Sequence, residues 1–162
     1  MSASASSSPR PASGSAAASP DPKDPMRSIT TPDAPKPFGH YSQAVVHAGM
    51  VYVAGMLPID PTTMKLVEGG IVAQTERTLK NVEAVLEAAG SDLDRLVSVT
   101  IYITDMAYWP QVNEIYARVL GDHRPARAVI PVLPIRHGAF IEIQAIAGVD
   151  PDRSRASGEH LA

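Results

Sequence analysis

The sequence contains no cysteine among its 162 residues, which excludes disulfide bonds, thiol catalysis and cysteine-ligated metals. A reducing compartment is compatible with this absence, and a cytoplasmic location is expected. No apolar run approaches the ~18 residues needed to span a bilayer, so no membrane segment is expected. Basic residues form no block and the net charge is −3, so nucleic acid is not expected as the main partner.

Several motifs with well-understood chemistry are also missing. The sequence has no P-loop, no GxGxxG and no HExxH. Ser42 does not lie in a GxSxG elbow, so serine hydrolysis has no support. No two histidines are three or four residues apart, so no metal site is expected. The histidines are His40, His47, His123, His137 and His160.

The composition divides the chain into three parts. Residues 1–33 are interpreted as a disordered Ser/Ala/Pro-rich extension, because they have too few apolar side chains to offset the entropy cost of ordering. Met26 is an alternative start that would remove most of this extension. Residues 34–149 are predicted to form one domain with its own core. Residues 150–162 form a polar tail.

Hydrophobic periodicity within the domain predicts the element order ββαβαββ. The first two strands form a hairpin through His47-Ala48-Gly49, and a glycine follows each helix, as is typical of helix ends. Trp109 and Tyr116 on the second helix are interpreted as core-packing residues. The predicted strands are 41–46, 50–54, 97–103 and two last strands joined by residues 133–138. The predicted helices are 71–89 and 109–120.

These elements predict an α+β fold, a mixed sheet with both helices on one face. The other face must then meet water or another chain. Alternation along 140–147 predicts that one side of the last strand faces the core, and this side carries Ile141, Ile143 and Ala145. The opposite side combines Phe140 and Ile146 with a carboxylate, Glu142. An oligomer is therefore expected, with any site that carries Glu142 between subunits.

Glu142 is the residue in this strand that most needs an explanation, since a buried carboxylate without a partner is costly. Arg127 is the cation on the preceding predicted strand. Two interpretations remain open. The two residues form a structural ion pair, or they form a site in which Arg127 grips a carboxylate and Glu142 orients or deprotonates water. Tyr41 is a third candidate for such a site.

Four stretches in order along the domain carry a resemblance to a known family. They are Gly39-His40-Tyr41-Ser42-Gln43-Ala44, Val53-Ala54-Gly55-Met56-Leu57-Pro58, the helix from Gln74 to Gly90, and Pro125-Ala126-Arg127 together with 141–147. They resemble the GPYSQA opening, the strand ending in SGQ and proline, the first helix and the C-terminal signature of the RidA (YjgF-type) family of reactive imine/enamine deaminases. The resemblance covers about residues 26–148.

This resemblance implies a chorismate-mutase-like α+β fold assembled as a homotrimer, with sites in the clefts between subunits. It implies that Arg127 binds the substrate carboxylate, that Glu142 holds the hydrolytic water and that Tyr41 lines the pocket. It further implies ligand contacts from the backbone of two residues and from one helix residue near the cleft. These are Gly55, Val129 and Asn113.

The implied reaction is hydrolysis of a 2-aminoacrylate-type enamine, or of the 2-imino acid tautomer, to a 2-oxo acid and ammonia. No metal or organic cofactor is expected, because the substrate is already activated and the protein needs to supply only positioning and proton transfer. Two alternatives remain. In the first, the chain is a non-catalytic family member that binds small carboxylic acids or unfolded protein through the same clefts. In the second, it is a ribonuclease. The negative net charge makes the ribonuclease the weakest interpretation.

Three departures from the family pattern predict a more apolar pocket. His40 replaces a proline, Ala54 and Met56 replace the polar residues around the following glycine, and Val129 stands where a small residue or cysteine is common. A preference for imino acids with larger side chains, or a narrower deaminase activity, is therefore expected. His40 either adds a titrating group to the pocket or is a surface residue.

Overall fold

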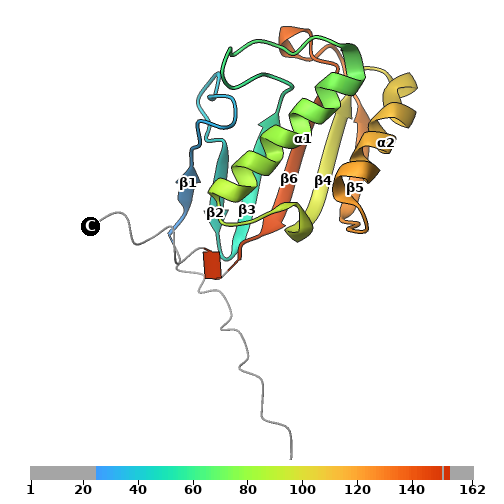
Figure 1. Ribbon diagram of the computed structural model, residues 1–162. Coiled ribbons are helices and arrows are strands. Elements are labelled where there is room, and N and C mark those ends of the chain that lie inside the picture. The colour runs from blue at the N-terminus through green and yellow to red at the C-terminus, as the bar shows by residue number, and fades with distance from the viewer. Residues whose placement is uncertain (1–24, 151, 154–162) are drawn as a thin grey trace, which may run out of the picture.

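The computed structural model describes residues 25–150 and 152–153. Its strands form one mixed sheet in the order β1-β2-β3-β6-β4-β5, with β4 and β5 parallel and all other neighbours antiparallel. Both helices lie on the same face of this sheet, as predicted (Figure 1). The strands are β1 Arg27–Ile29, β2 Ala44–His47, β3 Met50–Met56, β4 Leu96–Ile103, β5 Ala126–Pro131 and β6 Ile141–Gly148. The helices are α1 Gly70–Ala88 and α2 Trp109–Leu120, with short 3-10 turns η1 Leu93–Arg95, η2 Met106–Tyr108 and η3 Arg136–Gly138.

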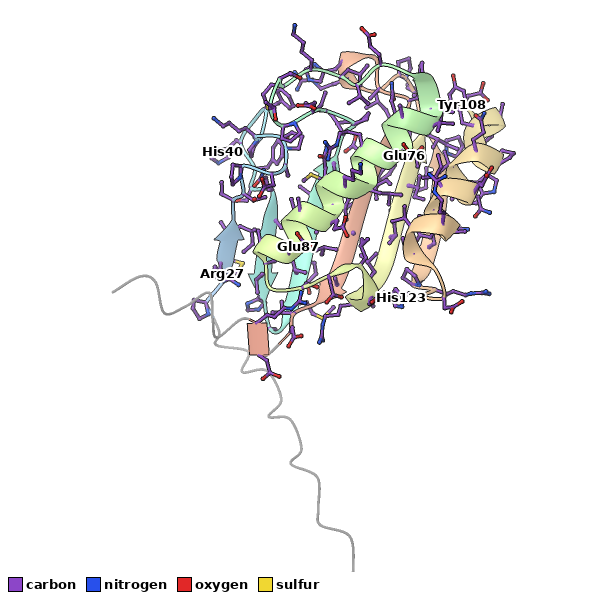
Figure 2. The ribbon with its side chains drawn as sticks, in the orientation of Figure 1. Arg27, His40, Glu76, Glu87, Tyr108 and His123 are labelled. Carbon is purple, nitrogen blue, oxygen red and sulfur yellow. The ribbon has the colours of Figure 1, made fainter. Side chains whose placement is uncertain are left out.

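The predicted hairpin and helices are confirmed. β2 and β3 pair through a two-residue turn in which Ala48 and Gly49 both have positive φ, the backbone that matches the twist of a hairpin. Glu76 and Glu87 extend from the face of α1 that points away from the sheet, which is the predicted solvated face (Figure 2). Neither helix of the described chain is long and apolar enough to cross a membrane.

The core lies between the helices and one face of the sheet. Ile101 and Ile141 have no exposed surface, and neither do Val85 and Leu86 of α1. Burial alternates along β6 as the sequence predicts, so every second residue of this strand faces the helices. Glu142 therefore projects from the opposite face, which no helix covers.

The sheet begins before the predicted domain boundary at residue 34. β1 pairs with β2, and the segment after it is held by the buried side-chain amide of Gln43. This amide donates hydrogen bonds to the carbonyls of Thr31, Ala34 and Pro35 at 2.9–3.1 Å, and its oxygen accepts one from the Thr31 N–H at 2.7 Å. Residues 27–33 thus belong to the domain and not to a disordered extension, while residues 1–24 lie outside the described residues.

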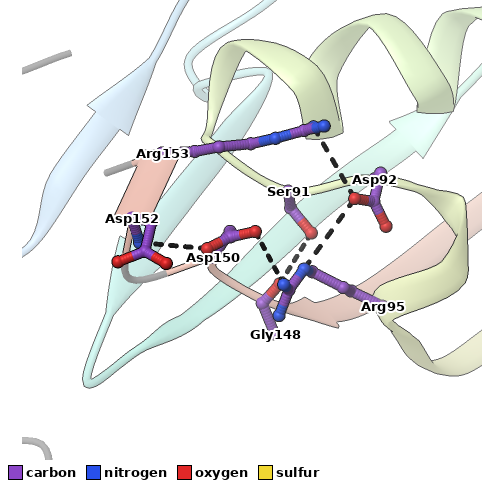
Figure 3. A network of polar contacts seen from close by, with 7 residues as sticks. All are labelled: Ser91, Asp92, Arg95, Gly148, Asp150, Asp152 and Arg153. Atoms are coloured by element: carbon purple, nitrogen blue, oxygen red, sulfur yellow. Dashed lines mark hydrogen bonds and ion pairs between the residues drawn. The ribbon is translucent and has the colours of Figure 1, made fainter. Parts of the chain in front are cut away.

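A polar network anchors the end of β6 to the segment after α1 (Figure 3). The Ser91 hydroxyl donates to the Gly148 carbonyl at 2.6 Å, and Arg95 pairs with Asp150 at 2.6 Å. These contacts fix the carboxyl end of β6, and Glu142 lies near the opposite end of the same strand. Asp150, Asp152 and Arg153 are the only parts of the predicted polar tail within the described residues.

The uncovered face of the sheet differs from the prediction at one residue. Phe140 precedes β6 and packs against Tyr108, at 5.3 Å between ring centroids, near the start of α2 (Figure 2). Its N–H donates to the Gln74 side-chain oxygen at 2.7 Å, which turns the chain inward before the strand begins. Tyr52 and Ile130, which are 46% and 39% exposed, lie on this face, and so does Ile146, which pairs with Tyr52 and was predicted there.

Candidate functional site

The uncovered face carries a cleft of about 810 Å³ around Glu142. One wall is the turn before β2, where the Tyr41 hydroxyl accepts a hydrogen bond from the Phe38 N–H at 3.2 Å. The opposite wall is the segment between β5 and β6, whose His137 ring lies 4.7 Å from the Phe38 ring. The remaining lining comes from β3, the residue after it, β4 and β6, and consists of Ala54, Gly55, Leu57, Tyr102, Glu142 and Gln144.

A β-bulge brings Gly55 against the Glu142 side chain. Between Val53 and Met56, two residues of β3 lie opposite the single residue Gln144 of β6. A Cβ atom at Gly55 would lie only 1.8 Å from one Glu142 carboxylate oxygen and 2.8 Å from its carboxyl carbon. Only glycine therefore leaves room for the carboxylate at this position.

The Glu142 carboxyl lies in a setting that favours its neutral form. The side chain is half-buried, and this burial raises the pKa of the Glu142 carboxyl above its ordinary value. None of the ion pairs between described residues includes Glu142. A carboxylate with a raised pKa, open to a cleft, is suited to accept a proton from water.

Arg127 lies on the other side of the sheet. Its partner in the parallel register of β4 and β5 is Val99, which is buried beneath the helices, so Arg127 projects toward α2. The guanidinium donates to the Asn113 side-chain oxygen at 3.2 Å. The guanidinium carbon lies 4.6 Å from the Trp109 ring centroid and 4.7 Å from that of Tyr116. A smaller hollow of about 350 Å³ opens here, lined in part by Asn113, Tyr116, Arg124 and Arg127.

The six predicted site residues thus fall into two groups. The cleft group on the uncovered face is Tyr41, Gly55 and Glu142. The edge group on the helix side of β5 is Arg127, Val129 and Asn113. The structural ion pair between Arg127 and Glu142 that the sequence left open does not form within the chain, because the two side chains project from opposite faces. Neither group of predicted residues contains both a guanidinium and a carboxylate, although Arg136, which was not predicted, also lines the cleft.

The residues that depart from the family pattern were expected to make the pocket more apolar, but they do not all line the cleft. Ala54 lines the cleft, but Met56 does not: it is 4% exposed, lies opposite Ile143 and is part of the core. Val129 belongs to the edge group. His40 is exposed and is not part of the cleft lining, which agrees with the surface interpretation (Figure 2).

Two aromatic residues have a further role that was not predicted from the sequence. Trp109 and Tyr116 pack in or against the core, as predicted, and both rings also contact the Arg127 guanidinium. A signal was present, since Trp109, Asn113 and Tyr116 are spaced i, i+4, i+7 and so share one helix face. Residues 25–150 and 152–153 contain no cluster of three His, Asp or Glu side chains that could bind a metal.

Comparison with known proteins agrees with this fold. The family model described as Endoribonuclease L-PSP matches residues 31–149. A RutC family protein of Pyrococcus horikoshii is 44% identical over 119 residues, covering 74% of this chain and 94% of that protein. The 2-iminobutanoate/2-iminopropanoate deaminase of Mus musculus is 39% identical over 123 residues, covering 76% and 91%. A crystal structure of a conserved Rid protein family member from Yersinia pestis has a TM-score of 0.75 at 43% identity, covering 77% and 100%. The chain therefore belongs to the Endoribonuclease L-PSP family, which includes the Rid and RutC proteins, as its four motifs predict.

Proposed function

We propose that the protein hydrolyses reactive 2-imino acids and their enamine tautomers to 2-oxo acids and ammonia. The observation that carries this proposal is the half-buried Glu142 carboxylate, which lies against Gly55 in an open cleft and takes part in none of the ion pairs between described residues. Such a group is suited to activate water. The mouse relative, 39% identical, is described as an enzyme that acts on imines of this class.

The proposed chemistry needs two protein groups. The Arg127 guanidinium binds the substrate carboxylate through two parallel hydrogen bonds. The Glu142 carboxylate takes a proton from water as the water oxygen attacks the imine carbon, and the imine nitrogen gains a proton. The resulting carbinolamine collapses: its hydroxyl proton is transferred to the amino nitrogen, the C–N bond breaks and ammonia leaves. The product is the 2-oxo acid, and the net reaction consumes one water.

With Arg127 as the clamp, a complete site requires two subunits. Arg127 and Glu142 project from opposite faces of the sheet, so one subunit supplies the carboxylate clamp and another supplies the base. Tyr52 and Ile130 on the uncovered face give an apolar surface for such an assembly. A head-to-tail contact of this kind closes into a ring, and we propose a homotrimer. Tyr41 then lines the pocket on the Glu142 side, while Val129 and Asn113 flank the clamp.

The cleft lining supports a preference for larger imino acids. Phe38, Leu57, Leu133 and Ile135 form an apolar wall beside Ala54. The leucine-derived imine is expected to be hydrolysed with a kcat/KM roughly tenfold higher than that of the alanine-derived imine, because its side chain covers this wall. Leu133→Ala should reduce the advantage, and Val72→Ala on the exposed side of α1 should not. Equal kcat/KM values for the two imines in the unmodified protein would contradict the preference.

The function itself is tested by generating 2-imino acids with an amino-acid oxidase and trapping the remaining imine with semicarbazide. The purified protein is expected to accelerate the loss of trapped imine and the appearance of ammonia. Single-stranded RNA serves as the comparison substrate, because the family description names an endoribonuclease. No acceleration with imines from several amino acids would reject the deaminase in favour of a protein that only binds small carboxylic acids.

A further inference from the structure

The guanidinium of Arg127 lies between two aromatic rings of α2. Trp109 and Tyr116 are seven residues apart, so their positions on the helix are about 10.5 Å apart along its axis. The Arg127 guanidinium carbon is 4.6 Å from one ring centroid and 4.7 Å from the other. Both distances are within the range of a cation–π interaction, which an arginine makes readily because its guanidinium is flat.

We propose that Trp109 and Tyr116 are positioning residues, which hold Arg127 ready to bind the substrate carboxylate. This inference rests on the proposed function, in which Arg127 is the clamp. Arg127 is exposed and belongs to the edge strand β5, so without these rings its long side chain would sample many rotamers. A clamp that is already ordered loses less conformational entropy on binding and binds more tightly.

The Asn113 contact leaves most of the guanidinium available. Its side-chain oxygen accepts one hydrogen bond, at 3.2 Å, and a guanidinium has five N–H groups. The guanidinium carbon lies over both rings, and the Tyr116 hydroxyl accepts no hydrogen bond from it. The remaining donors can therefore form the paired hydrogen bonds that a carboxylate requires.

The contact from Tyr116 is made by its ring and not by its hydroxyl. Tyr116 is only 6% exposed, and its buried hydroxyl has no hydrogen-bond partner among the described residues. A buried hydroxyl without a partner contributes nothing favourable to the fold. Phenylalanine at this position would keep the ring beside Arg127, whereas leucine would keep the bulk and remove the π face.

This difference provides a matched test. Tyr116→Leu and Trp109→Leu are each expected to raise KM for 2-iminopropanoate on the order of tenfold with little change in kcat, because a cation–π contact is lost from ground state and transition state alike. Tyr116→Phe and Trp109→Phe are expected to restore KM to within about twofold of the unmodified protein. Thermal unfolding followed by circular dichroism shows which variants remain folded.

A spectroscopic measurement tests the contact even if a leucine variant does not fold. Trp109 is the single tryptophan of the sequence, so its fluorescence reports on the environment of Arg127. Arg127→Met is expected to change the emission of Trp109, and pyruvate should change it in the unmodified protein but not in Arg127→Met. Unchanged emission in Arg127→Met would overturn the proposal.

The outcomes separate this proposal from the proposed function. If Arg127→Met hydrolyses imines with an unchanged KM, Arg127 is not the clamp, and the positioning role falls while the deaminase function stands. If the unmodified protein hydrolyses no imine, the proposed function itself fails. If Arg127→Met is inactive but folded leucine and phenylalanine variants have the same KM, the clamp stands and the positioning role of the two rings is rejected.

Discussion

Replacing Glu142 by Gln is expected to slow imine hydrolysis by about 10²–10⁴-fold, because the amide has the same shape but cannot take a proton from water. The assay is the semicarbazide trap described above, with saturating imine. Substrate binding should change little, since Arg127 and the apolar wall are untouched, so the loss should appear in kcat and not in KM. A variant that keeps more than about half of the activity would show that Glu142 is not the base.

The pH dependence provides an independent check on the same residue. Burial raises the pKa of the Glu142 carboxyl, and the base is present only above that pKa. The activity of the unmodified protein should therefore fall as the pH is lowered through a pKa that is higher than that of an ordinary glutamate. The residual activity of Glu142→Gln should not show this fall. Measuring kcat/KM against pH for both proteins tests this, with circular dichroism at each pH as the control for unfolding.

The raised pKa also fixes the sign of the stability effect. The folded state binds the Glu142 proton more tightly than the unfolded state, so stability falls as the pH rises from the unfolded pKa to the folded pKa. Glu142→Gln removes the titrating group, so this decrease in folding stability with rising pH should be absent from the variant. The variant should be at least as stable as the unmodified protein near neutral pH, which distinguishes a functional carboxylate from one that holds the fold together.

Gly55→Ala is expected to lower kcat on the order of a hundredfold without unfolding the protein. The added Cβ would lie 1.8 Å from a Glu142 carboxylate oxygen, so the carboxylate must rotate away from the cleft. The φ angle of Gly55 is not positive, so alanine causes no backbone strain there. The activity assay and a thermal unfolding curve should therefore diverge, with activity lost and the midpoint nearly unchanged.

A double-mutant cycle tests whether Gly55→Ala acts through Glu142. If it does, combining Gly55→Ala with Glu142→Gln should cost little beyond Glu142→Gln alone, because the displaced group is already inactive. Ala54→Gly, a change at the neighbouring bulge residue, is the matched control and should remain active. Multiplicative losses in the double variant would show that Gly55 serves another purpose.

Much of this fold could be predicted from the sequence, because the decisive signals are local. The apolar spacing from Ile71 to Ala89 and the alternation of β6 each specify one buried face. β1 was missed because three residues before a proline-rich segment give no periodicity, and the segment is held by Gln43 from about a dozen residues away. Interactions of that range leave no local pattern.

The candidate site could be predicted residue by residue but not in its arrangement. Alternation correctly assigned Glu142 to the face without helices. The face of Arg127 could not be predicted, because every residue of β5 is exposed or half-buried and the parallel register with β4 is not visible in the sequence. Gly55 was predicted only as a glycine of a family motif whose backbone contacts the ligand. Its contact with Glu142 depends on a bulge that only the pairing of β3 with β6 reveals.

The central claim is that each site takes Arg127 from one subunit and Glu142 from another, and hybrid oligomers test it most directly. Arg127→Ala and Glu142→Gln chains with different affinity tags are co-expressed, and assemblies that contain both are purified through both tags. Each variant alone should be inactive. A trimer that holds both variants has one intact site, so the hybrids should recover about one third of the unmodified activity. Hybrids as inactive as the separate variants would contradict the account, because both residues would then act within a single chain.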